Sequence, residues 1–158
     1  MSWKEFRDRA KLIEEQFAKK LINPIWANDN ENINEHWDVK GLFKDKLLKF
    51  DVKSMKKKNR YDNNFQDDVA WVEGTNVSGN PGWLKGKADY ISFERNNHWL
   101  LVDRESLLEF VNKKLKENNF EKGKGIYKIY QREGRLDKIT MVPFEDIEKF
   151  TSCERIQK

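Results

Sequence analysis

The order in which apolar periodicities follow one another most constrains the fold of this 158-residue chain. In residues 2–22, apolar side chains recur at intervals of three and four residues, which is the pattern of an amphipathic helix. Pro24 and the polar stretch NDNENINE end this pattern. The stripe expected to face the core consists of Trp3, Phe6, Ala10, Ile13, Phe17 and Leu21.

Short runs after this helix have the composition or the alternation of strands. HWDVKGLF and KLLKFDVKS are separated by Lys44 and Asp45, so we expect a hairpin there. GTNVSGNPGWLKGK is rich in Gly, Asn and Pro, which is typical of a loop. The predicted strands in this part of the chain are residues 36–43, 46–54, 69–73, 88–95 and 98–102.

In the last third of the chain, the spacing of apolar residues changes again, first to that of a helix and then to that of strands. Asp103 can cap a helix over about residues 104–118. GIYKIYQRE and DKITMV are predicted as strands joined by a turn at Gly134, and Pro143 begins a short helix. The inner face of the longer helix would carry Leu107, Leu108, Val111 and Leu115.

The order helix, strands, helix, strands, helix predicts an α/β or α+β fold, with a central mixed β-sheet flanked by helices. We expect a single domain over residues 1–158, because no segment has the composition of a linker. Hydrophobic and charged residues each make up 37% of the chain, which is polar, but six Trp and ten Phe argue against disorder.

Positive charge is concentrated in one segment. Residues 40–60 contain nine Lys and Arg against two Asp, whereas acids outnumber bases in the rest of the chain. A concentrated basic patch favours a polyanionic partner such as DNA. The alternative is a solvated, lysine-rich surface.

Several classes of protein are not favoured. Cys153 is the only cysteine, so neither an intrachain disulfide nor a cysteine zinc site is expected. No apolar run approaches the length of a membrane span, and the charged N-terminus does not resemble a secretory signal. We therefore expect a cytoplasmic protein with no membrane partner.

One predicted strand carries an acid and a base together. Asp51 and Lys53 are two residues apart, so they project from the same face of the strand, while Phe50 and Val52 project into a core. Asp38 lies in the preceding short strand, and pairing of the two strands would bring both carboxylates within reach of one cation. Carboxylates around a hard divalent ion are the pattern that Mg²⁺ needs. A chance pair of charges on a strand edge is the alternative, usually a weak salt bridge.

A third acid is expected from the first helix. Glu14 lies about 55° from the centre of the apolar stripe, whereas Glu15 lies about 155° away, at 100° per residue. Glu14 is therefore predicted to belong to the site and Glu15 to face water. Alternatively, both pair with lysines on the surface of the helix.

Glu14, Asp38, Asp51 and Lys53 together resemble the active-site motif of the PD-(D/E)xK nuclease superfamily. The chain is most similar to the small nucleases of tailed phages, because WVEGTNVSGNPGWLKGKADYISFE also matches a pattern that follows their active site. The resemblance covers roughly residues 10–102. It departs at the proline that names the motif, since Trp37 precedes Asp38.

This resemblance implies a restriction-endonuclease-like core and a metal-dependent site. Mg²⁺, for which Mn²⁺ can substitute, would be bound by Asp38 and Asp51. Glu14, directly or through water, and the backbone carbonyl of Val52 would complete the protein ligands. Lys53 would act at the attacking water.

Other residues are candidates for contact with nucleic acid. Glu73 could add a carboxylate to the site or could instead face solvent or anchor a loop. Trp83 and its loop could contact a phosphate backbone or a base, but a tight connection plugged by Trp83 is favoured. Asp89 is expected to hold this loop by hydrogen bonds, and His36 supports the site at most. The predicted nucleic-acid contacts are Lys56, Lys57, Lys58, Arg60, Asn76, Lys85 and Lys87.

The sequence thus predicts a Mg²⁺-dependent deoxyribonuclease, a hydrolase that cleaves phosphodiester bonds with a Glu-Asp-Asp-x-Lys site. A homodimer would suit cleavage of two strands, but nothing in the sequence requires one. Two alternatives stay open: a nuclease-fold DNA-binding protein with a weak or inactive site, and an interaction protein of unrelated fold. DNA or RNA, single strand, duplex or junction, and endonuclease or exonuclease action are not distinguished.

Overall fold

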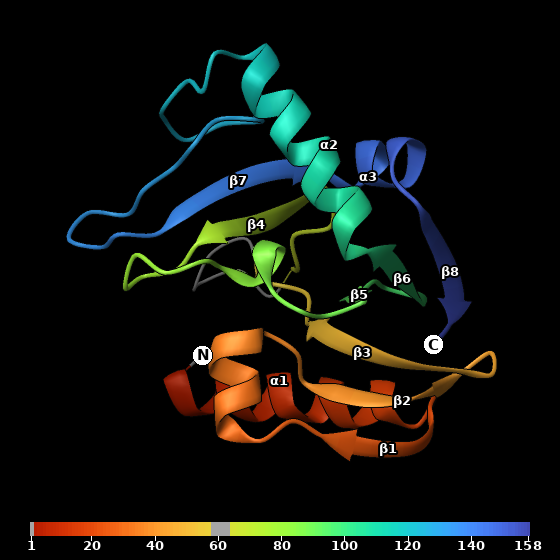
Figure 1. Ribbon diagram of the computed structural model, residues 1–158. Helices are drawn as coiled ribbons and strands as arrows, with labels where there is room; N and C mark the ends of the chain where they lie inside the picture. Colours follow the sequence, from red (N-terminus) through yellow and green to blue (C-terminus); the bar gives the residue numbers. More distant parts are fainter. Residues whose placement is uncertain (1, 58–63) are drawn as a thin grey trace.

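The computed structural model describes residues 2–57 and 64–158, and its largest element is a six-stranded sheet (Figure 1). The strands of this sheet, in spatial order, are β1 (Ile22–Trp26), β2 (Val39–Phe43), β3 (Lys46–Lys53), β5 (Tyr90–Glu94), β6 (His98–Asp103) and β8 (Cys153–Gln157). A separate two-stranded sheet pairs β4 (Val69–Thr75) with β7 (Lys138–Pro143). The helices are α1 (Trp3–Ala18), η1 (Glu31–Glu35), η2 (Trp83–Lys85), α2 (Arg104–Glu117) and α3 (Phe144–Phe150).

The six-stranded sheet is mixed. β3 and β5 pair in parallel, while each other neighbouring pair in this sheet is antiparallel. The prediction of an α+β fold with a central mixed sheet is therefore confirmed. None of the helices in the described part of the chain is long and apolar enough to cross a membrane.

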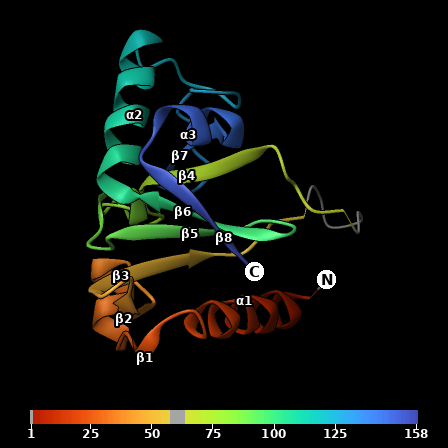
Figure 2. The same ribbon diagram turned by 90° about the vertical axis from the view of Figure 1, so that its right-hand side faces the viewer.

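The six-stranded sheet lies between two apolar layers (Figure 2). Residues Phe50 and Val52 of β3 face α1, where they pack with Ile13 and Phe17. The other face carries a larger core that includes residues of β4, β7, α2 and α3. Because side chains alternate along a strand, Asp51 is directed toward that second layer.

The predicted hairpin is confirmed. β2 and β3 pair antiparallel from Val39 opposite Phe50 to Phe43 opposite Lys46. Lys44 and Asp45 both have positive φ, 50° and 66°, as a two-residue hairpin turn requires. The register of this hairpin sets Asp38, just before β2, beside the second half of β3.

The first helix is shorter than predicted. α1 ends at Ala18, and Leu21 is buried from a turn rather than from a helix. Residues 22–26 then form the edge strand β1, which sequence patterning does not predict because it contains Pro24 and its side chains are all exposed. An edge strand tolerates proline, since one side of its backbone needs no partner.

The C-terminal third departs most from expectation. The strand predicted over residues 125–133 is wrong: this segment makes isolated bridges to β7, and Tyr127 has a φ of 58°, which interrupts extension. β8 is not predicted, because Ile156 is the single large apolar residue in its five-residue run. It is held instead by pairing with β6, from His98 opposite Gln157 to Val102 opposite Cys153.

Candidate active site

A polar recess of about 380 Å³ opens between the two sheets at the end of β3. It receives side chains from α1, from the segment before β2, and from β3, β4 and β5. Residues that carry charge or hydrogen-bonding groups into it include Glu14, Asn32, His36, Asp38, Asp51, Lys53, Lys56, Gln66, Trp71, Glu73, Glu94 and Arg95. The site residues predicted on separate segments thus meet in one recess.

Asp38 is oriented by contacts on both carboxylate oxygens. Its Oδ2 accepts a hydrogen bond from the backbone N–H of Val52 at 2.7 Å, and its Oδ1 accepts one from Nδ2 of Asn32 at 2.8 Å. Its own backbone N–H donates to the Phe50 carbonyl at 2.8 Å. The hairpin and η1 together therefore fix the direction of this carboxylate.

Asp51 is 4% exposed, and its carboxyl group lies close enough to that of Asp38 for Asp38 to raise its pKa. Two carboxyl groups in contact repel each other when both are ionised, so they favour either a shared proton or a cation between them. Oδ1 of Asp51 also lies 3.1 Å from Nζ of Lys53. The Asp51-x-Lys53 pair predicted on one strand face is thus present as an ion pair.

The electrostatics of the recess reflect burial and crowded negative charge. Burial raises the pKa of Asp51 to about 8; the charge of Asp38 adds to this effect, and Lys53 opposes it. Burial also raises the pKa of Glu14 to about 7, together with the charge of Asp38. For Lys53, burial alone would lower the pKa, but Asp51 and Asp38 outweigh it and the net pKa is raised.

Lys53 is held as an ammonium. Its side chain is 30% exposed, and its Nζ lies 3.1 Å from Oδ1 of Asp51 and 4.8 Å from the centre of the Trp83 ring. An ammonium between a carboxylate and an aromatic face is doubly favoured.

Glu14 and Glu15 lie as the helical geometry predicts. Glu14 is half-buried and lines the recess, within electrostatic range of Asp38 and Lys53. Glu15 is exposed and does not line it. Position on the apolar border of α1 therefore separates the two neighbouring acids.

The donor set of the recess is compatible with a divalent cation, although it is sparse. Among residues 2–57 and 64–158, no group of three or more His, Cys, Asp or Glu side chains is arranged to hold a metal ion. Mg²⁺ in proteins is commonly bound by one or two carboxylates and keeps several waters, so the pair of Asp38 and Asp51 has the chemistry of such a donor set. The Val52 N–H points toward Asp38, and in a strand the carbonyl of the same residue points to the same side. That carbonyl therefore lies on the side of β3 that faces Asp38.

Glu73 also lines the recess, on the same face of β4 as Trp71. Its charge acts on both Lys53 and Lys56. Its backbone is closely covered by the 76–82 loop, because a Cβ on Gly82 would lie 2.5 Å from the Glu73 carbonyl oxygen. Glu73 thus lines the recess while its backbone lies against the loop.

The predicted basic contacts have different surroundings. Lys56 is exposed at the recess, and Lys57 follows it in an isolated bridge with Phe65. Lys58 and Arg60 lie outside the described residues. Lys85 and Lys87 are exposed but do not line the recess.

The loop after β4 is built as a connection. Oδ1 of Asn76 accepts hydrogen bonds from the backbone N–H groups of Ser78 and Asn80, so this side chain shapes its own turn. Trp83 is 7% exposed and packs in the core, as the favoured interpretation predicts. Asp89 accepts a hydrogen bond from the Lys49 N–H at 2.8 Å, so its side chain ties the residue before β5 to β3 rather than to the loop itself.

Some residues of the recess are not evident from the sequence. Asn32 orients Asp38 from η1, a segment whose polar composition suggests only a loop. His36 has a left-handed backbone and its Nε2 lies 2.9 Å from the Pro81 carbonyl oxygen, so it braces two loops beside the acids. For the contact between Asn32 and Asp38, the only signal in the sequence is an asparagine six residues before the aspartate.

Comparison of the chain with protein-family models, with curated protein sequences and with solved structures gave no significant match in any of the three.

Proposed function

We propose that this protein is a Mg²⁺-dependent deoxyribonuclease of the PD-(D/E)xK type, with a restriction-endonuclease-like core. One observation carries the proposal: the carboxyl groups of Asp38 and Asp51 contact each other in a polar recess, with Nζ of Lys53 3.1 Å from Asp51. Had the two carboxyl groups been far apart, they could not have shared one cation. Their contact supports a cation site over a chance pair of charges.

In this proposal the acids bind the ion and orient the scissile phosphate. Asp38 and Asp51 hold Mg²⁺, or Mn²⁺ in its place, with the Val52 carbonyl and with Glu14, directly or through water. The bound ion supplies charge neutralisation of the phosphate and a nucleophilic water at neutral pH. Asn32 keeps Asp38 in position through its hydrogen bond to Oδ1.

Lys53 acts as a cation in this mechanism. Its raised pKa keeps it protonated near neutral pH, so it donates hydrogen bonds to the attacking water or to phosphate oxygens as negative charge develops. The ion pair with Asp51 and the Trp83 ring hold its ammonium in place. Lys56 and Lys57, which follow β3 directly, would contact the DNA backbone on the approach to the recess.

The proposal extends to the setting of the protein. It acts as a nuclease of phage type, as a single domain, in the cytoplasm of a bacterial cell or a phage-infected host. A homodimer would let two copies cut two strands.

A nuclease-fold DNA-binding protein with a weak or inactive site is the second candidate. It is favoured by the sparse donor set, since the described residues contain no compact group of three metal-binding side chains. Such a protein would keep the basic residues after β3 but would need none of the acids. Dependence on metal ions therefore separates the two candidates.

The first experiment measures cleavage of supercoiled plasmid and of labelled single-stranded and branched DNA, with Mg²⁺, Mn²⁺ or EDTA. We expect metal-dependent cleavage that falls at least about 100-fold in Asp51→Ala and Lys53→Ala, the scale of losing a charge aimed at the transition state. Asp45→Ala and Lys46→Ala are matched controls, because both residues are exposed at the turn of the same hairpin.

The helical acids give a second test of the same site. Glu14→Gln should lower the cleavage rate and raise the Mg²⁺ concentration needed for half-maximal rate, whereas Glu15→Gln should behave as wild type. Equal effects of the two substitutions would remove Glu14 from the site. Salt-sensitive DNA binding without cleavage, indifferent to Asp51→Ala, would establish the binding protein instead.

A further inference from the structure

An aromatic cluster with one lysine lies beside the recess and has no part in the proposed chemistry. The rings of Trp71 on β4 and Tyr130 are 6.5 Å apart between centroids, at an angle of 60°. Nζ of Lys124 lies 5.9 Å from the Trp71 centroid and 5.8 Å from that of Tyr130. Two segments distant in sequence, β4 and residues 124–130, therefore bring two rings and one cation together.

Trp71 joins this cluster to the recess. Its ring lines the recess, on the strand face that also carries Glu73, and is half-buried. Its Nε1 donates a hydrogen bond to Oε1 of Gln66 at 2.7 Å, which fixes one edge of the indole. A ring held at its edge keeps its orientation and can stack a planar ligand at low entropic cost.

The cation of the cluster is available to an anion. Lys124 is exposed, and no acidic side chain within residues 2–57 and 64–158 forms an ion pair with it. Lys56, at the recess itself, adds a second positive charge on the same side, within electrostatic range of Arg132 from the Tyr130 segment. Rings for a base together with lysines for its phosphates match the chemistry of a nucleotide.

Packing alone does not require the Tyr130 ring. Tyr130 is tied to Ile139 by two backbone hydrogen bonds of 2.8 Å, one in each direction, so the segment is anchored to β7 without its side chain. The half-buried Tyr130 ring therefore contributes aromatic surface beside Trp71 without being needed to anchor its segment.

The geometry points to a subsite in which Trp71 stacks an unpaired DNA base, with Tyr130 edge-on beside it, while Lys124 contacts the adjoining phosphate. Within a duplex, neighbouring bases already cover both faces of each base, so a protein ring that stacks there must first separate two bases, whereas an unpaired base offers its face without this cost. The substrate class is therefore single-stranded or branched DNA. This inference rests on the proposed function for the identity of the polymer and deepens it.

The test compares DNA binding in EDTA, where no cleavage occurs, by fluorescence anisotropy of a labelled single-stranded oligonucleotide and the matching duplex. Trp71→Ala should weaken single-strand binding by about 5- to 150-fold, the effect of losing one base–aromatic stack, and should change duplex binding less than about twofold. Trp71→Phe should restore most of the affinity, because it keeps a ring. Trp3→Ala is the matched control, since Trp3 is 71% exposed on α1.

A second arm removes the base instead of the ring. A strand of the same length built of abasic nucleotides should bind wild type more weakly than the normal strand, and Trp71→Ala should lose most of this difference. Lys124→Ala should weaken both strands alike, whereas Lys122→Ala, an exposed neighbour, should have a smaller effect. Equal discrimination against the abasic strand by wild type and Trp71→Ala would overturn the subsite.

The two proposals fail differently. Metal-dependent cleavage lost in Asp51→Ala, with Trp71→Ala cutting single-stranded and duplex DNA as wild type does, would leave the nuclease and remove the stacking subsite. Absence of cleavage, with single-strand binding that still depends on Trp71, would remove the nuclease and leave the subsite. Loss of secondary structure in Trp71→Ala, seen by circular dichroism, would transfer the test to Tyr130→Ala, whose backbone anchor remains.

Discussion

At the scale of single residues, Asp51 illustrates how a candidate active site opposes folding. A buried carboxyl group next to another carboxyl group is disfavoured as an ion, and its pKa is raised to about 8. In the unfolded chain the same group ionises near pH 4. The folded protein therefore binds more protons than the unfolded chain between about pH 4 and pH 8, so this residue makes the metal-free protein less stable as the pH rises through that window.

We therefore expect Asp51→Asn, which mimics the neutral acid, to be more stable than wild type at pH 8 in EDTA and to lose this advantage at pH 5. The gain should be about 1 to 2 kcal/mol, less than the whole shift would give at about 1.4 kcal/mol per pKa unit, because the substitution also leaves Lys53 without its anionic partner. Urea unfolding at the two pH values measures the free energy of unfolding. A difference between the proteins that is the same at both pH values would contradict the assigned pKa.

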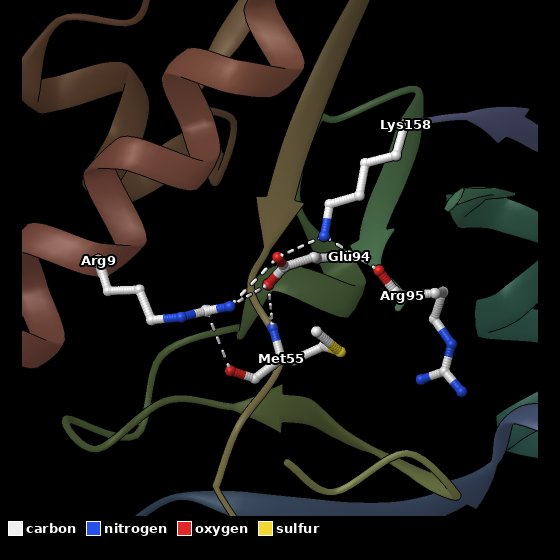
Figure 3. A network of polar contacts seen from close by, with 5 residues as sticks. All are labelled: Arg9, Met55, Glu94, Arg95 and Lys158. Atoms are coloured by element: carbon white, nitrogen blue, oxygen red, sulfur yellow. Dashed lines mark hydrogen bonds and ion pairs between the residues drawn. The ribbon is translucent and has the colours of Figure 1, made fainter. Parts of the chain in front are cut away.

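At the scale of elements, one buried carboxylate joins α1, β5 and the C-terminus. Oε1 of Glu94 accepts hydrogen bonds from Nη2 of Arg9 and from the Met55 N–H, both at 2.9 Å, and Oε2 accepts one from Nζ of Lys158 at 2.9 Å (Figure 3). The Glu94 side chain is 2% exposed. Burial alone would raise its pKa, but these contacts outweigh burial and the net pKa is lowered.

Glu94→Gln should lower the free energy of unfolding by about 2 to 4 kcal/mol at pH 7, because it leaves Arg9 and Lys158 without the anion between them. Glu154→Gln is the matched control: its partner Lys44 is largely exposed, so the loss should stay below about 1 kcal/mol. The Glu94 contribution is present above its unfolded pKa and lost as the pH falls through the lowered folded pKa. Denaturation of both variants at pH 7 and pH 3 checks the sign.

The same network bears on the candidate site, because Met55 lies two residues after Lys53. Arg9 also stacks its guanidinium 4.5 Å from the centre of the Phe65 ring, so it contacts both ends of the segment between Met55 and Phe65. The lysines that follow β3 thus come directly after Met55, whose position is fixed by the contacts with Arg9 of α1 and with Glu94.

At the scale of the whole molecule, the recess takes its lining from both sheets, and Lys56 in this lining is followed directly by Lys57. Double substitution of Lys56 and Lys57 by Ala should weaken DNA binding for all sequences and reduce the slope of log affinity against log salt by about 1 to 2, one per lost phosphate contact. Substitution of Lys44 and Lys46 removes the same charge from the far end of the hairpin and should leave the slope nearly unchanged. An equal decrease in both variants would mean that only net charge matters.

Local sequence patterns determined much of the candidate site. The 3.6-residue period of α1 distinguishes Glu14 from Glu15, and the two-residue period of β3 puts Asp51 and Lys53 on one face. The hairpin follows from two strands separated by two residues. These features depend on backbone geometry over a few residues, which the sequence expresses directly.

The pairing of the edge strands and the long-range contacts of the site depend on the tertiary structure. β1 and β8 are short and expose many side chains. Their extended conformation therefore depends on hydrogen bonds to β2 and β6, which lie elsewhere in the chain. The contact of Asp38 with Asp51 requires the register of the hairpin, and the cluster at Trp71 requires the Lys124 and Tyr130 segment to fold back onto β4. Such contacts have no period in the sequence, because the groups that satisfy them are brought together only when the layers pack.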